Sequence, residues 1–411
     1  MSTRVKSVRA WEILDSRGRP TVAASCELEN GASAQAHAPS GASTGRHEAV
    51  ELRDAGATRY AGLGVRGAVA HVNDLIAPAL AGLDALDQSA IDQKMIAFDG
   101  TPDKSRLGAN AILAASCAVA RAAALAQKIP LWRWLAGQRQ PVMPVPMVNI
   151  LSGGLHAGGN IEFQDFLVVP HGVSGYPAQL EAIVAVHRET KKLLDERGLH
   201  VTGVADEGGW GPRLPSNEAA IQILTDAIHR AGQPMSIALD VAATHFYRDG
   251  RYELSTEHRS LDAAGMAALI ADWARQYPIR SVEDPLEEDD WPGWQHLTAQ
   301  LGDKLQLVGD DFFTTNLARL NRGIAEKAAN AVLVKMNQIG TLTETLAVVD
   351  RAREAGYRAV ISARSGETED SFLADLAVAT GAGQIKVGSI TRSERLAKYN
   401  RLLEIYHHEL Q

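Results

Sequence analysis

The run Met235-Ser236-Ile237-Ala238-Leu239-Asp240 is the first of four short apolar runs in the C-terminal half that end in an acid or a lysine. The others are Ile279–Asp284, Leu305–Asp310 and Ala331–Lys335. A buried parallel strand is typically an apolar run of this kind. A functional residue at its C-terminal end is typical of a (β/α) barrel active site. The runs therefore predict a parallel barrel.

The residues that end these runs suit metal and proton chemistry. One acid at a strand end is often a helix cap, but Asp240, Glu283 and Asp310 would point three charges toward one mouth, where they repel unless a cation neutralises them. Carboxylate oxygens are suitable ligands for a hard cation such as Mg²⁺. Lys335 beside them would serve as a general base. Its alternative role is a salt bridge to a neighbouring strand acid.

The next two predicted strands end in basic residues. The run 359–365 closes with Arg364 and Ser365, and the run 384–388 contains Lys386. A guanidinium group offers a planar fork for phosphate or carboxylate. Together these side chains indicate a doubly anionic substrate. Alternatively, they neutralise the acids across the barrel.

Glycine-rich loops carry further candidates. His156 lies in Gly153–Gly159, ahead of Gln164-Asp165, and Glu207 lies in Asp206-Glu207-Gly208-Gly209. A lone histidine is more often structural, but beside the other candidates His156 could contact the substrate. Residues 62–67 match the G-x-G-x-x-G dinucleotide fingerprint, yet no buried strand precedes them, so the match is weak.

Composition restricts the class of protein. The chain has 411 residues with 45% apolar residues, which suits a barrel plus a smaller domain. A net charge of −8 argues against nucleic acid as a partner. Two cysteines form no disulfide framework, and no stretch indicates a signal peptide or a membrane span. We expect a cytoplasmic protein with no membrane partner.

The chain divides near a proline-containing connector. Residues 1–138 should form an α+β N-terminal capping domain, and residues 139–411 the (β/α)8 catalytic barrel. Within the first part, the sequence predicts strands over 4–28, helices over about 66–95 and 108–128, and a flexible loop over 39–45.

Six motifs, in order along nearly the whole chain, resemble the enolase family. They are Asp15-Ser16-Arg17-Gly18, Ser40-Gly41-Ala42-Ser43-Thr44-Gly45, Gly108-Ala109-Asn110-Ala111-Ile112-Leu113, Asp206-Glu207-Gly208-Gly209, Val334-Lys335-Met336-Asn337-Gln338-Ile339-Gly340-Thr341 and Ser365-Gly366-Glu367-Thr368-Glu369-Asp370. The resemblance implies an α/β fold, an enolase-type barrel with one antiparallel strand. It also implies Mg²⁺-dependent dehydration of 2-phosphoglycerate to phosphoenolpyruvate, as in glycolysis, by a homodimer or higher oligomer.

The resemblance assigns a role to each candidate. Two Mg²⁺ ions are implied, the second bound together with the substrate. The family's positions fall on the metal ligands Asp240, Glu283, Asp310 and Ser43, the base Lys335, the acid Glu207, the phosphate contacts Arg364 and Ser365, the carboxylate contact Lys386, and His156 near the phosphate.

The sequence departs from the family on the acid side of the site. Ala363 stands where the family has a histidine, and Asp165 where it has a glutamate. Trp210-Gly211 also replaces the usual residues after the Asp206–Gly209 motif. Space at Ala363 favours the same chemistry on a bulkier phosphonate substrate, as in phosphonate biosynthesis by carboxyphosphonoenolpyruvate synthase. A non-catalytic scaffold is the third reading, but it would need neither Lys335 nor the three carboxylates.

Overall fold

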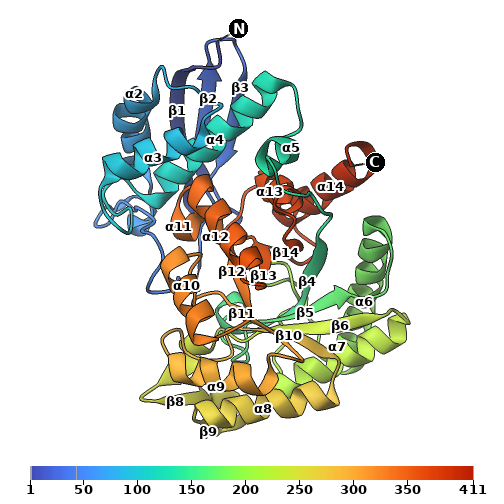
Figure 1. Cartoon of the computed structure of the whole chain (residues 1–411). Helices are drawn as coiled ribbons and strands as arrows, with labels where there is room; N and C mark the ends of the chain where they lie inside the picture. Colours follow the sequence, from blue (N-terminus) through green and yellow to red (C-terminus); the bar gives the residue numbers. More distant parts are fainter. Residues whose placement is uncertain (1, 43, 411) are drawn as a thin grey trace.

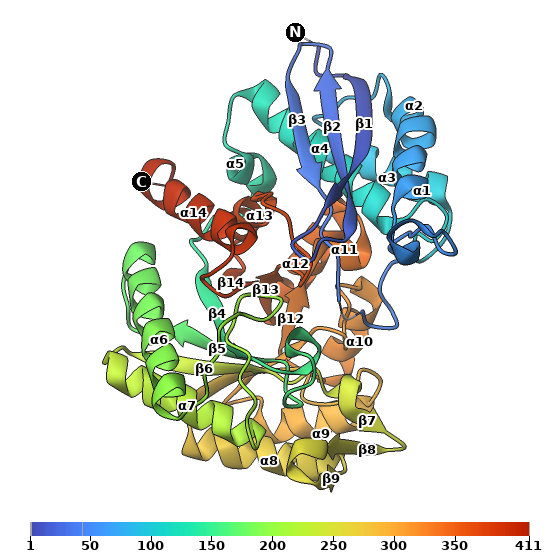
Figure 2. The ribbon, with the colours of Figure 1, turned by 180° about the vertical axis from the view of Figure 1, so that it is seen from behind.

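The structure, a computed structural model, describes residues 2–42 and 44–410. Those residues form a small α+β domain and a closed barrel, which lie one above the other in Figures 1 and 2. The predicted boundary at residues 138 and 139 falls between the last helix of the first part and the first barrel strand. The boundary itself remains a prediction.

The N-terminal domain is a three-stranded antiparallel sheet packed against helices. The sequence motif Asp15–Gly18 makes the predicted turn between the first two strands. The strands are β1 (Val5–Leu14), β2 (Pro20–Leu28) and β3 (Ser33–His37), and the helices are η1 (Arg59–Gly62), α1 (Arg66–Ala70), η2 (His71–Ile76), α2 (Ala77–Leu80), α3 (Gln88–Asp99), α4 (Ala109–Gln127) and α5 (Leu131–Ala136).

Helix α4 is the core of this domain. Among the described residues it is the one helix long and apolar enough to cross a membrane, but most of it is buried inside the protein. It packs on β2 and β3, so its alanines allow a close approach of helix and sheet. Its apolar character is that of a core helix.

The region predicted as helical over about 66–95 forms helices, and the structure adds that they are interrupted after residue 80. Helix α2 ends at Leu80, where Ala81 turns to extended backbone and Gly82 takes a φ of +79°. A new helix, α3, then starts behind Asp87, whose carboxylate caps the amide of Ala90. A short amphipathic pattern can continue in phase across such a turn, which periodicity alone does not reveal.

The barrel closes through eight strands in the order β10-β11-β12-β13-β14-β4-β5-β6. Strand β5 runs antiparallel to both neighbours, and the other neighbouring pairs are parallel. The barrel strands are β4 (Val145–Ser152), β5 (Asp165–Pro170), β6 (Met235–Asp240), β10 (Ile279–Glu283), β11 (Gln306–Gly309), β12 (Ala331–Val334), β13 (Arg358–Ser362) and β14 (Gly383–Gly388).

Helices surround the barrel, and a small three-stranded sheet extends one connection. The helices are η3 (Gly154–Ala157), α6 (Tyr176–Glu196), α7 (Asn217–Ala231), η4 (Ala243–Phe246), η5 (Ser255–Glu257), α8 (Ala263–Gln276), α9 (Trp291–Leu301), α10 (Leu317–Glu326), α11 (Met336–Ile339), α12 (Leu342–Glu354), α13 (Phe372–Thr380) and α14 (Ser393–His408). The small sheet comprises β7 (Tyr247–Arg248), β8 (Arg251–Leu254) and β9 (Arg259–Leu261). The four apolar runs that predicted the barrel all form barrel strands, so the predicted (β/α)8 fold is confirmed.

The N-terminal domain is docked over the C-terminal ends of the barrel strands. The amide of Ser16 donates to the carbonyl of Glu367 at 2.7 Å, and the amide of Ser40 donates to Gly366 at 2.8 Å. Arg121 on α4 pairs with Asp370 at 2.6 Å. These contacts place the loop after β3 against the mouth of the barrel.

Candidate active site

Strand register brings the predicted carboxylates together. In the parallel pair of β6 and β10, Asp240 lies directly opposite Glu283. Asp310 follows β11, whose Val308 pairs with Glu283. All three side chains are buried at the C-terminal mouth of the barrel. The burial of three like charges in one place requires compensation by cations.

Two lysines provide that compensation in this structure. The Nζ of Lys386 lies 2.7 Å from Asp240 Oδ2 and 2.7 Å from Glu283 Oε2. The Nζ of Lys335 lies 2.5 Å from Asp310 Oδ2. Burial disfavours the ammonium form of Lys335, but the charges of Asp310 and Glu283 together outweigh burial and raise the lysine pKa. Lys335 is therefore protonated as long as Asp310 is its partner.

The carboxylates also fit a divalent cation. Glu283 Oε1 is buried and accepts no hydrogen bond in the described part of the chain. Burial, followed by the charge of Asp240, raises the pKa of Glu283 well above its ordinary value. An oxygen without a partner among hard carboxylate donors suits Mg²⁺. Asp240, Glu283 and Asp310 would hold such an ion.

A further pair of acids, which the sequence argument did not single out, supports Asp310. Asp284 adopts a φ of +41°, which is rare for a non-glycine residue. Its carboxylate accepts the amides of Asp310 at 2.9 Å and Asp311 at 2.7 Å. Asp284, Asp310 and Asp311 offer ligand atoms within 4.8 Å of one another. The adjacent acids Glu283-Asp284 and Asp310-Asp311 in the sequence could have indicated this second pair.

Two glutamines orient the same carboxylates. Gln338 Nε2 donates to Asp310 Oδ1 at 2.9 Å, and Gln164 Nε2 donates to Asp240 Oδ2 at 3.2 Å. An amide that holds one carboxylate oxygen fixes the direction of the other. The glutamines therefore position two of the three predicted metal ligands.

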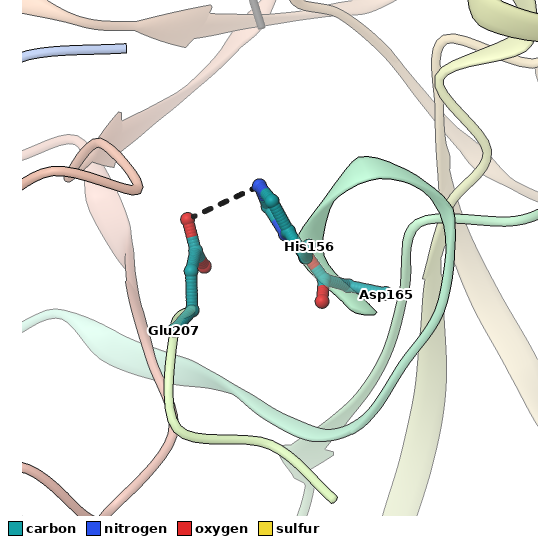
Figure 3. Close-up of side chains that lie close together, drawn as sticks. All are labelled: His156, Asp165 and Glu207. Carbon is teal, nitrogen blue, oxygen red and sulfur yellow. Dashed lines mark hydrogen bonds and ion pairs between the residues drawn. The ribbon is translucent and has the colours of Figure 1, made fainter. Parts of the chain in front are cut away.

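The acid half of the site is a buried group of His156, Asp165 and Glu207, which converge from two loops and the start of β5 (Figure 3). His156 Nδ1 lies 2.8 Å from Asp165 Oδ2, and its Nε2 lies 3.8 Å from Glu207 Oε1. The histidine therefore bridges the two acids. Because β5 is reversed, its first residue lies opposite Asp240 at the barrel mouth.

Both carboxylate oxygens of Asp165 have hydrogen-bond partners. Its Oδ1 accepts from Asn149 and, at 2.9 Å, from Ser152 Oγ, while its Oδ2 faces His156. Each carboxylate oxygen of Asp165 thus has at least one partner. Its geometry fits the holding of His156 in one orientation.

The surrounding charges shift the pKa values of His156 and Glu207 in opposite directions. Burial disfavours the imidazolium form, but Asp165 and Glu207 outweigh burial and raise the pKa of His156 to about 9. Burial alone would raise the pKa of Glu207, but the charges of His156, Arg395 and Lys386 outweigh it and lower that pKa. The site therefore holds a charged donor beside an ionised acid.

Arg364 and Ser365 face the loop from the N-terminal domain. Arg364 donates to both oxygens of Glu48, at 2.9 and 3.2 Å, and to Asn337 Oδ1 at 2.9 Å. Ser365 Oγ accepts from the amide of Ala42 at 2.7 Å. The charge of Arg364 also acts on Asp310, so the arginine belongs to the same site.

The structure thus brings most of the predicted residues to one mouth. The hydroxyl of Ser365 contacts Arg17 and Ala42 of the N-terminal domain, which lies against that mouth. Ser43, the predicted ligand of a second Mg²⁺, lies outside the described residues. Ala363 is buried at the end of β13, next to Arg364, and its amide donates to the carbonyl of Lys386.

Two protein-family models match the chain. The enolase N-terminal domain matches residues 5–135, and the enolase C-terminal TIM barrel domain matches residues 140–410. Together they account for nearly all 411 residues. The reversed strand, the three carboxylates at neighbouring strand ends and the two lysines agree with that match. On these grounds, the chain belongs to the enolase family.

Proposed function

We propose that this protein is a Mg²⁺-dependent hydro-lyase that converts 2-phosphoglycerate to phosphoenolpyruvate. The observation that carries the proposal is the placement of a buried lysine and a buried acid within electrostatic reach of each other at the barrel mouth. The charge of Lys335 acts on Glu207, and both lie beside the cluster of Asp240, Glu283 and Asp310. Elimination of water needs this combination, because a proton leaves one carbon while a hydroxide leaves the next.

Lys335 would remove the proton next to the substrate carboxylate. It can act as a base only when its ammonium form is no longer held by Asp310, which lies 2.5 Å away. Asp240, Glu283 and Asp310 would hold Mg²⁺, which supplies fixed positive charge beside the substrate carboxylate. Lys386, now between Asp240 and Glu283, would then be available to bind that carboxylate.

Glu207 would protonate the departing hydroxyl group. His156 is charged, its Nδ1 is fixed by Asp165, and its Nε2 faces Glu207 at 3.8 Å. This arrangement supports a transfer in which the Nε2 proton of His156 passes to Glu207 and from there to the leaving oxygen. Arg364 would bind the phosphate in exchange for Glu48.

A bulkier phosphonate substrate is the second candidate function. Two observations favour it: Ala363 has a side chain smaller than the family's histidine, and a cavity of about 730 Å³ borders His156. That cavity is lined by the His156 loop and by residues 198–206 and 211–213. An added anionic group would have room on this side of the acid half.

One assay separates these possibilities. The purified protein is stripped with a chelator and assayed with 2-phosphoglycerate and with phosphono analogues, with and without Mg²⁺. We expect turnover only with Mg²⁺, abolished in Lys335→Ala and kept in the exposed control Lys192→Ala. Full turnover without metal, or none on any member of the panel with Mg²⁺, would contradict the proposal. The ratio of kcat/KM values decides between the two substrates.

A further inference from the structure

A second group of basic side chains lies at the opposite end of the barrel from the candidate active site. Arg280 is the second residue of β10, and Arg358 is the first residue of β13. Lys304 lies in the turn just before β11. Asp240 and Glu283, in contrast, are the last residues of their strands. The basic group is therefore separated from the proposed catalytic residues by the length of the barrel.

These side chains line one cavity of about 660 Å³, here called the basal pocket. This volume lies within the range of about 300–1,000 Å³ that is typical of small-molecule sites. The pocket is lined by His171, Arg280, Gly302, Asp303, Lys304, Leu305, Gln306, Asn330, Gly356 and Arg358.

The charges in the basal pocket are not compensated by ion pairs. Within residues 2–42 and 44–410, no ion pair is formed by Arg280, Lys304, Arg358 or the single acid Asp303. Exposed arginines elsewhere commonly have an acidic partner, as in Arg275–Asp272, Arg197–Asp226, Arg230–Glu196, Arg322–Glu326 and Arg353–Asp350. Three cations against one acid leave the pocket positive in a chain of net charge −8.

A chain of hydrogen bonds anchors one of the arginines, Arg358. Arg358 donates from one nitrogen to Gln306 Oε1 at 3.3 Å, and Gln306 Nε2 donates to Ser281 Oγ at 3.2 Å. Gln306 is buried, so this chain anchors the guanidinium and leaves its other donors for a ligand.

The charge of the second arginine, Arg280, acts on the neighbouring His171. Burial, and then the charge of Arg280, lower the pKa of His171. His171 is therefore neutral near neutral pH, and an anion bound beside Arg280 would raise its pKa again.

We propose that the basal pocket binds a small molecule that carries a diphosphate or two phosphate groups. Two planar guanidinium groups suit one phosphate each, and Lys304 adds a mobile charge. The pocket is too small for a macromolecule, and the negative net charge of the chain disfavours a nucleic acid. This site is independent of the proposed reaction at the other end of the barrel.

Titration calorimetry with inorganic pyrophosphate tests the proposal. We compare the parent protein with Arg280→Gln/Arg358→Gln, with Lys304→Gln and with Arg9→Gln, an exposed arginine on β1. The double variant should weaken binding at this site at least about tenfold, in line with the loss of charge-assisted hydrogen bonds. Lys304→Gln should weaken binding less, and Arg9→Gln should not change it; within residues 2–42 and 44–410 the Lys304 side chain forms no hydrogen bond or ion pair that the substitution would break.

An Arg364→Gln variant distinguishes the basal pocket from the barrel mouth, where pyrophosphate could also bind. Binding that persists in Arg364→Gln and disappears in the double variant supports the basal pocket. Binding lost in Arg364→Gln and retained in the double variant overturns the proposal. Imidazole NMR gives a local readout: pyrophosphate should shift the His171 signal in both the parent and Arg364→Gln, and an unmoved His171 signal would also overturn it.

Discussion

His156 should make a pH-dependent contribution to stability that can be measured directly. The perturbation is His156→Gln, which removes the charged ring that lies between Asp165 and Glu207. A rise of the histidine pKa from 6.5 to about 9 corresponds to about 3 kcal/mol of preference for the charged form in the folded protein. Since the ring is buried, solvent screening reduces this value little.

The sign follows from linkage between protonation and folding. The folded pKa lies above the unfolded value, so the contribution of His156 is complete below pH 6.5 and is lost as the pH rises through about 9. We expect the difference in unfolding free energy between parent and His156→Gln to shrink by about 3 kcal/mol between about pH 6 and pH 9.5.

Urea denaturation of metal-free protein at several pH values provides the assay, and His187→Gln is the matched control. Burial lowers the pKa of His187 to about 4, so its contribution is complete above pH 6.5 and falls toward acid pH. The two variants should therefore show slopes of opposite sign. A pH-independent difference for His156→Gln, or an NMR titration of its ring near pH 6.5, would refute the reasoning.

Three further outcomes test the proposed reaction. Lys335→Ala should abolish both dehydration and exchange of the substrate α-proton with solvent, whereas Glu207→Gln should impair dehydration and spare exchange; parental exchange in Lys335→Ala would show that the base is misassigned. The loop over 40–45, whose Ala42 amide contacts Ser365 Oγ, should exchange its amide hydrogens more slowly when Mg²⁺ and a substrate analogue are both present, and equal protection without ligand would count against a lid. Ala363→His should raise kcat/KM for 2-phosphoglycerate and lower it for a bulkier phosphonate, and unchanged values for both would remove the substrate-shift hypothesis.

The barrel was predictable because its strands are buried on both sides. Runs such as 235–240 and 331–335 carry little polar character until their last residue, so both the strand and its functional end could be read from the sequence. Helix ends were harder. The spacing of apolar residues over 66–95 does not predict the break at Ala81, because the break depends on a local backbone turn.

The partners of the site residues could not be predicted. Glu48 on Arg364 and Gln338 on Asp310 are contacts between residues far apart in sequence, and no spacing rule connects them. Asp165 is one methylene shorter than the glutamate that the family has at this position, yet the structure surrounds its carboxylate with Asn149, Ser152 and His156. Whether an acid is well placed depends on which donors fold around it, and this is a tertiary property.

Because strand β5 is reversed, the segments before and after it lie at opposite ends of the barrel from those of the parallel strands. This placement matters for the redesign of the scaffold. In a uniformly parallel barrel, the segment after each strand shapes the mouth. Here the segment before β5 carries His156 to the mouth, and the segment after it delivers His171 to the basal pocket. Grafted or lengthened sequence just after Pro170 would thus alter the basal pocket alone, while changes just before Asp165 would alter the mouth. Six residues of strand separate two independently editable surfaces.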